Sequence, residues 1–164
     1  MMATAYLGIG CNLGDRQANV SRAIQLLTEH KDIDVIRVSA LMESPPEGGS
    51  SQPTYLNGAI EIKTELSPLE LLSQLKTIER RLGRTKGAAN APRPMDLDIL
   101  FYEDVVIVEG KTLSIPHPRL ASREFVLKPL AEIAPDLVHP RLQKSVRELY
   151  ENWTHESHLA PNGA

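Results

Sequence analysis

Two aspartates at the start of an apolar stretch are the first residues whose type and spacing suggest chemistry. Asp96 and Asp98 flank Leu97, and alternate side chains of an extended strand point to the same face. Their carboxylates then lie roughly 7 Å apart and repel each other unless a cation lies between them. Oxygen ligands favour a hard cation such as Mg²⁺, which often shares phosphate oxygens. Two solvated acids at a strand entrance are the alternative, and the pair alone favours that alternative.

A basic segment directly before the aspartates changes this balance. Residues 76–93 contain a single acid, Glu79, and six bases: Lys76, Arg80, Arg81, Arg84, Lys86 and Arg93. The last three lie in a Gly/Ala-rich stretch without periodicity, which predicts a loop. Arginine forks bind phosphate oxygens bidentately, and a loop can close over a bound ligand. Carboxylates and bases together are the groups that a nucleotide polyphosphate with Mg²⁺ requires. Arg80 and Arg81 are expected only to solvate a helix face.

A glycine-rich turn, residues 8–14, supports a second hypothesis. Strand, glycine turn and helix in this order are typical of dinucleotide-binding folds, so a nicotinamide-dependent oxidoreductase is considered. The spacing here is G-x-G-x-x-x-G, however, and the second predicted strand is followed by another strand. A third hypothesis is a non-catalytic domain that uses the basic segment to bind RNA or another anionic partner.

Aromatic residues are few, so those in polar settings are informative. Tyr55 and Asn57 alternate onto one face of a predicted strand, and Phe125 lies two residues after Arg123. Two aromatic rings with a neighbouring amide could clamp a flat heterocycle, although each ring alone is more often packing. His117, between two prolines, is either a loop hydrogen-bonding residue or a ligand contact.

The composition narrows the class of protein. The chain has 164 residues, 41% of them hydrophobic, and a net charge of -3, which disfavours disorder and non-specific nucleic-acid binding. Its single cysteine, Cys11, excludes an intramolecular disulfide. The sequence has no apolar run near the ~18 residues of a membrane span and no signal-peptide pattern. We expect one cytoplasmic domain over residues 1–153 and a frayed polar tail over residues 154–164.

The elements that must hold these groups follow from periodicity and capping. Ser67, Pro68 and Glu70 form a capping-box start of a helix that ends near Gly83. A second helix is expected over residues 15–30, and later helices near residues 125–133 and 145–153. Strands are expected over residues 3–9, 33–41, 55–63 and 97–102, with residues 105–108 as the hairpin partner of the last. The β-α-β-β-α-β order predicts an α+β fold with the ferredoxin-like split βαβ arrangement, an additional hairpin strand and C-terminal helices.

The motifs, taken together, resemble one known family. Pro-Arg-x-x-Asp-x-Asp-Ile ends at Ile99, and Pro-His-Pro-Arg ends at Arg119. With residues 6–14, 44–46, 52–57, 78–84 and 123–130, they resemble the 6-hydroxymethyl-7,8-dihydropterin pyrophosphokinases of folate biosynthesis. The resemblance extends to about residue 140. It implies transfer of pyrophosphate from ATP to the pterin hydroxymethyl group, with release of AMP. We also expect a monomer that binds neither nucleic acid nor membrane.

The resemblance also implies roles for individual residues. The residues expected at the reacting phosphates are Arg84, Arg93, Asp96 and Asp98, with the two aspartates holding two Mg²⁺ ions. The residues expected around the pterin are Ser44, Pro45, Glu47, Tyr55, Asn57 and Phe125. The residues expected around ATP are Leu72, Lys76, Glu79, Arg84, Lys86, Arg93, Ile99, Ser114, His117 and Arg123.

Overall fold

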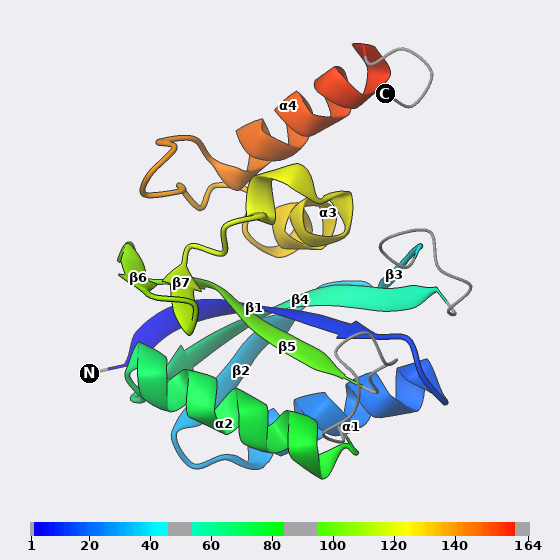
Figure 1. Cartoon of the computed structure of the whole chain (residues 1–164), viewed down its shortest axis with the longest axis vertical. Coiled ribbons are helices and arrows are strands. Elements are labelled where there is room, and N and C mark those ends of the chain that lie inside the picture. The colour runs from blue at the N-terminus through cyan, green and yellow to red at the C-terminus, as the bar shows by residue number, and fades with distance from the viewer. Residues whose placement is uncertain (1, 46–53, 84–94, 160–164) are drawn as a thin grey trace.

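The fold is a mixed α/β arrangement around one antiparallel sheet (Figure 1). The computed structural model describes residues 2–45, 54–83 and 95–159. Its strands are β1 (Ala3–Cys11), β2 (Ile33–Val38), β3 (Met42–Ser44), β4 (Tyr55–Thr64), β5 (Asp96–Tyr102), β6 (Ile107–Glu109) and β7 (Leu113–Ile115). Its α-helices are α1 (Arg16–Glu29), α2 (Pro68–Arg81), α3 (Glu124–Ile133) and α4 (Val146–Leu159), and a short 3-10 turn, η2, covers Leu120–Ser122.

Side-chain hydrogen bonds cap the N-termini of α1 and α2. The Asp15 carboxylate accepts a hydrogen bond of 3.1 Å from the Ala18 N–H and caps α1. At α2 the Ser67 hydroxyl accepts from the Glu70 N–H at 3.2 Å, and the Glu70 carboxylate accepts from the Ser67 N–H at 2.9 Å. This capping box satisfies backbone donors that the first helical turn cannot pair internally. The predicted start of α2 is therefore confirmed.

The main sheet has the strand order β2-β4-β1-β5, and the short β3 pairs with β4. All of these pairings are antiparallel. Strand β1 lies between β4 and β5, so its residues face a partner on each side. Gly10 is paired with Asn57 of β4 and with Asp96 of β5, which places these three residues in one row across the sheet.

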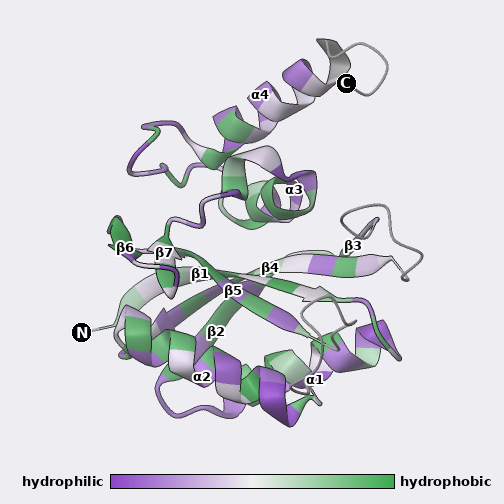
Figure 2. Ribbon diagram, in the orientation of Figure 1, coloured by the Kyte–Doolittle hydropathy of each residue, from purple (hydrophilic) through white to green (hydrophobic). Residues whose placement is uncertain are grey.

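Hydrophobic residues pack on both faces of the sheet. One cluster joins Leu7 and Ile9 of β1 to the buried sides of α1 and α2. The second cluster joins Leu100 and Phe101 of β5 to α3 and α4 on the opposite face. Figure 1 shows the two pairs of helices on opposite sides of the sheet, and Figure 2 shows hydrophobic and hydrophilic residues alternating around each helix. Asp98 stays exposed, so α3 and α4 cover only part of their face.

One predicted strand pairing and two predicted element boundaries differ from the structure. The predicted pairing of residues 105–108 with β5 is wrong, because β6 pairs with β7 in a separate two-stranded sheet. That hairpin turns at Gly110, whose φ of 57° is readily adopted by glycine. The predicted strand over residues 33–41 is two strands, β2 and β3, and helix α4 continues beyond Trp153 to Leu159.

Candidate active site

The paired aspartates lie on the sheet face opposite α1 and α2. Leu97 and Ile99 point into the cluster beneath the sheet, so Asp96 and Asp98, which alternate with them, point to the other side. Asp96 is half-buried and Asp98 is exposed. The prediction that both carboxylates share one face is confirmed.

Gly10 lies between Asp96 and Asn57 in the row across the sheet, and side chains of β4 lie close to it. A Cβ atom built on Gly10 would lie 3.2 Å from Asn57 Oδ1 and 3.7 Å from Tyr55 Cδ1. Because Gly10 has no side chain, the row across β5, β1 and β4 has a carboxylate on one side and a primary amide on the other. Neighbouring strands are ~4.8 Å apart, so the Cα atoms of Asp96 and Asn57 are separated by roughly 10 Å.

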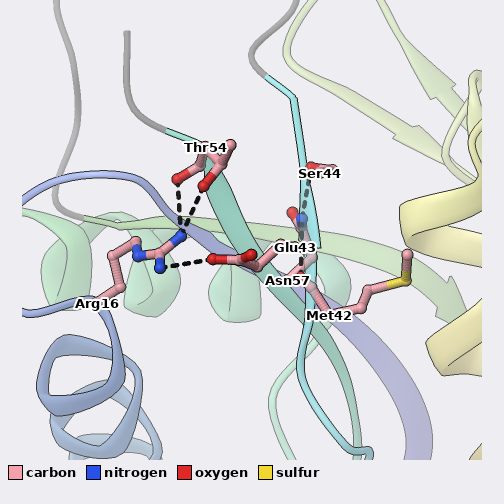
Figure 3. Close-up of polar contacts among 6 residues, drawn as sticks. All are labelled: Arg16, Met42, Glu43, Ser44, Thr54 and Asn57. Atoms are coloured by element: carbon pink, nitrogen blue, oxygen red, sulfur yellow. Dashed lines mark hydrogen bonds and ion pairs between the residues drawn. The ribbon is translucent and has the colours of Figure 1, made fainter.

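Asn57 is held in one orientation by β3 (Figure 3). Its Nδ2 donates to Ser44 Oγ at 2.6 Å and to the Met42 carbonyl at 3.4 Å. Asn57 and Ser44 are both buried, so the hydrogen bond between them lies away from solvent. A buried polar group that loses its partner costs free energy, so this pairing is strongly favoured. Since Nδ2 is engaged with β3, the Oδ1 atom is the end of the amide that faces Gly10.

A cavity of about 460 Å³ lies beside this row, between β3 and the helices above the sheet. It is lined by Met42, Glu43, Ser44, Pro45, Arg119, Ser122, Arg123, Glu124, Phe125 and Trp153. Four predicted residues therefore meet here: Ser44, Pro45, Arg123 and Phe125. The Arg123 guanidinium lies over the Phe125 ring, 5.4 Å from its centroid, in a cation–π geometry.

The cavity also contains residues that sequence reasoning missed. Arg119 belongs to the Pro-His-Pro-Arg motif, and that context is a signal that could have singled it out. Trp153 comes from α4, far along the chain, and no local pattern connects it to β3. A flat ring, two guanidinium groups and an indole make this cavity suited to a planar, polar ligand.

Glu79 is a buried carboxylate that connects α2 to β5. Its side chain is 2% exposed, and Oε2 accepts a hydrogen bond of 2.8 Å from the Leu97 N–H. Lys76 Nζ lies 3.7 Å from Oε1. Glu79 thus fixes the start of the strand that carries Asp96 and Asp98, which is a positioning contact.

Three further residues predicted around ATP have contrasting surroundings. The side chain of Ile99 is buried in the cluster beneath the sheet, and Leu72 of α2 packs against the same cluster. Ser114 of β7 is half-buried and is paired with Val108 of β6. These side chains do not converge on the cavity beside β3, whose lining residues include none of them.

His117 is fixed by backbone bonds at the end of the loop after β7. Its N–H donates to the Leu100 carbonyl at 3.0 Å, and its Nδ1 accepts from the Arg119 N–H at 3.2 Å. Nδ1 is therefore the unprotonated nitrogen of the neutral ring, and Nε2 carries the proton. Burial lowers the pKa of His117 below its ordinary value, and the nearby Arg123 and Arg119 lower it further. His117 is neutral at pH 7 and can donate one hydrogen bond from Nε2.

Four predicted site residues lie outside the described residues: Glu47, Arg84, Lys86 and Arg93. Among the described residues, no group of three or more His, Cys, Asp or Glu could hold a metal ion. Asp96 and Asp98 alone are an oxygen-only donor pair. That set fits Mg²⁺, which commonly takes one or two carboxylates and completes its shell with water and phosphate oxygens.

Comparison with known proteins relates this geometry to one family. The family model described as 7,8-dihydro-6-hydroxymethylpterin-pyrophosphokinase matches residues 6–135. The chain belongs to this family. The match includes the glycine turn, the aspartate pair and the loop of His117, and it confirms the resemblance found in the sequence.

Individual relatives agree with the assignment. The chain is 42% identical over 147 residues to the 2-amino-4-hydroxy-6-hydroxymethyldihydropteridine pyrophosphokinase of Aquifex aeolicus, covering 90% of each chain. It is 43% identical over 144 residues to the folic acid synthesis protein fol1 of Schizosaccharomyces pombe, covering 88% of this chain and 20% of that protein.

A solved structure agrees with the fold. The crystal structure of Plasmodium falciparum HPPK-DHPS with pteroate superposes with a TM-score of 0.80 at 18% identity. The superposition covers 99% of this chain and 44% of that one. The chain thus spans a fifth of the yeast protein and less than half of the Plasmodium chain. Within the described part of this chain, no helix has the length and apolar character needed to cross a membrane.

Proposed function

We propose that this chain transfers a pyrophosphoryl group from ATP to 6-hydroxymethyl-7,8-dihydropterin, giving the pterin diphosphate and AMP. Pyrophosphoryl transfer to the hydroxymethyl dihydropterin in folate synthesis follows from family membership. We further propose that ATP is the pyrophosphoryl donor and that Mg²⁺ is the metal. The observation that supports them is the pair Asp96 and Asp98, two carboxylates on one sheet face whose oxygens suit Mg²⁺ shared with phosphate oxygens.

The pterin would lie on the Asn57 side of the row across β5, β1 and β4. A pterin is a flat ring with hydrogen-bonding groups along its edge. Tyr55 and Phe125 supply aromatic faces, and Asn57 and Ser44 supply polar atoms whose orientations are fixed by their mutual bond. Because this pair is formed before the ligand arrives, little conformational entropy is lost on binding.

The phosphates of ATP would lie on the carboxylate side. Mg²⁺ ions bound at Asp96 and Asp98 would offset the negative charge of the phosphates. Arg84 and Arg93, which lie outside the described residues, would add bidentate contacts to phosphate oxygens. His117, neutral with a proton on Nε2, would donate a hydrogen bond without adding charge.

The transfer itself needs no protein nucleophile. The pterin hydroxymethyl oxygen forms a bond to the β-phosphorus of ATP and releases its proton to the solvent. The bond from that phosphorus to the oxygen bridging the α-phosphate breaks, and AMP leaves with that oxygen. The protein brings the two reactants into line and holds them there, which supplies much of the rate enhancement of such reactions.

The detailed fold, the oligomeric state, the location and the domain bounds are proposals or predictions as well. We propose the ferredoxin-like split βαβ arrangement for the core, which the strand order β2-β4-β1-β5 supports. A monomeric state, a cytoplasmic location and a single domain over residues 1–153 stay predictions from the sequence.

The decisive experiment is to incubate the purified chain with ATP, Mg²⁺ and the hydroxymethyl dihydropterin and to separate the nucleotides. AMP formed in equal amount to pterin diphosphate supports the proposal. ADP as the product, or no turnover at saturating Mg²⁺, contradicts it. Asp96→Ala should abolish turnover while the thermal unfolding curve stays cooperative.

Neither alternative function gains support. In a dinucleotide-binding fold the first two strands are parallel neighbours, whereas here β4 lies between β1 and β2 and pairs antiparallel with both. A nicotinamide titration should therefore give no binding. The RNA-binding hypothesis predicts affinity for single strands at physiological salt without AMP formation, and the same preparation tests it.

A further inference from the structure

Arg16 connects two segments that carry the candidate pterin site, although it lies outside that site. It is the first residue of α1, and its side chain reaches β3 and the residue before β4 (Figure 3). Nη2 donates to Glu43 Oε1 at 2.7 Å. Nη1 donates to Thr54 Oγ1 at 2.9 Å and to the Thr54 carbonyl at 3.1 Å. One guanidinium therefore holds three acceptors on two segments.

The contact is more than a surface ion pair. An exposed pair of this kind contributes little by itself, and the Glu43 side chain is 61% exposed. The Arg16 side chain is only 29% exposed, however. Its planar guanidinium donates hydrogen bonds both to the Glu43 carboxylate and to the Thr54 backbone carbonyl. Lysine cannot reproduce this fork, because its ammonium is a point charge without a fixed plane.

The segments held by Arg16 are those that present Ser44 and Asn57. Strand β3 is three residues long and pairs only Met42, Glu43 and Ser44 with β4. So short a strand at the side of a sheet has few ladder bonds to fix its register. Ser44 follows Glu43 directly, and its hydroxyl accepts the 2.6 Å bond from Asn57. Tyr55, the residue opposite Ser44, follows Thr54 directly.

Side-chain alternation places the two contacts on opposite faces of the β3–β4 pair. Glu43 is paired with Leu56, which packs in the cluster beneath the sheet, where α1 also lies. Ser44 and Asn57 face the other side. Arg16 thus acts from the face covered by α1 and α2 on residues that point to the opposite face.

We propose that Arg16 is a positioning residue for the pterin. By fixing β3 against the start of β4, it sets the spacing between Ser44, Tyr55 and Asn57. This inference rests on the proposed function, because it concerns the binding of that reaction's pterin. Arg16 does not contact the aspartate pair in any described interaction, so its effect should fall on pterin binding and not on ATP binding.

The test compares Arg16→Ala with a matched control. Arg22→Ala removes an exposed arginine six residues further along the same helix. Arg16→Ala should raise KM for the pterin roughly fivefold, the loss expected for partly exposed charged hydrogen bonds, with KM for ATP and kcat within about twofold. Arg16→Lys should give an intermediate KM. Arg22→Ala should match the unmodified chain.

Two smaller changes test the same contact if Arg16→Ala does not fold. Glu43→Gln keeps the shape of the side chain but removes its charge, and Thr54→Val removes the hydroxyl. Each should raise KM for the pterin by about twofold, the scale of a single exposed interaction. Combining Glu43→Gln with Arg16→Ala should add little to Arg16→Ala alone, because both remove the same contact.

The outcomes separate this inference from the proposed function. If the unmodified chain forms no AMP, the proposed function fails. If it forms AMP and none of the variants changes KM for the pterin, the role of Arg16 is overturned. A uniform loss of kcat with every KM unchanged also overturns it, because that pattern reports a smaller folded fraction. A direct fluorescence titration with the pterin in the absence of ATP should give the same ranking of variants.

Discussion

Replacing Gly10 with alanine should impair pterin binding while leaving the fold intact. Gly10 lies between Asp96 and Asn57. The added Cβ would be 3.2 Å from Asn57 Oδ1, so the amide must move by a few tenths of an ångström. Asn57 cannot move freely, because its Nδ2 is held by Ser44 at 2.6 Å. The methyl group would also lie 3.7 Å from Tyr55 Cδ1.

The magnitude follows from these distances. A hydrogen bond contributes about 1 kcal/mol, so misaligning the Asn57 amide with its ligand should raise KM for the pterin roughly fivefold. Stability should change by less than about 1 kcal/mol, because a less flexible unfolded chain offsets the close contact. For a chain of this size that corresponds to a shift in melting temperature of at most roughly 4 °C.

Gly8→Ala is the matched comparison. Gly8 lies on the same strand and face, but its added Cβ would meet the Leu100 side chain at 3.3 Å, away from Asn57. KM for each substrate, kcat and the melting temperature would be measured for both variants. We expect Gly8→Ala to change KM for the pterin by no more than about twofold. An unchanged KM in Gly10→Ala, or an equal rise in both variants, would refute the reasoning.

Three further predictions concern the metal, pH and the scaffold. Asp98→Asn should lower kcat about a hundredfold or more and raise the Mg²⁺ concentration needed for half-maximal rate, because a neutral amide is a poorer ligand for the cation than a carboxylate. Burial and nearby arginines lower the pKa of His117 and of His139, so the unfolded chain takes up protons below pH ~6.5 that the folded chain does not. The free energy of unfolding, measured by urea titration, should therefore be highest above that pH and fall as the pH decreases toward the folded-state pKa values. The slope should be at most about 1.4 kcal/mol per pH unit for each histidine, and it should be shallower in His139→Gln. Ser67→Ala should remove about 1 kcal/mol of stability by breaking the capping box of α2, yet leave kcat/KM unchanged.

The parts of the fold that could be predicted are those fixed by residues close in sequence. The α2 helix starts through a bond between Ser67 and Glu70, three residues apart, so the sequence alone identifies it. Alternation along residues 96–99 similarly determines which face Asp96 and Asp98 occupy. Partner choice between distant strands is different. Residues after Tyr102 have ordinary strand composition, which does not specify the strand they pair with. The chain turns back at Gly110, so β6 pairs with β7 and not with β5.

The sequence identifies individual residues of the candidate site, but it does not predict how these residues are placed relative to one another. Asp96 and Asn57 were identified separately, from a carboxylate pair and from an amide near an aromatic ring. Their placement on either side of Gly10 depends on the registers of two strand pairings, which no local pattern specifies. Trp153 was missed for the same reason, because α4 reaches the cavity only through its packing above the sheet.

The direction of β1 has a practical consequence for handling the protein. The strand begins at Ala3, and Gly10, which shares a row with Asp96 and Asn57, lies roughly 23 Å further along it at 3.3 Å per residue. Helix α4, by contrast, contributes Trp153 to the cavity wall before it ends at Leu159. An affinity tag, a fluorescent label or a surface tether is therefore best attached upstream of β1, where it hangs from the far end of the sheet. The same group joined after α4 would begin within two turns of the cavity lining.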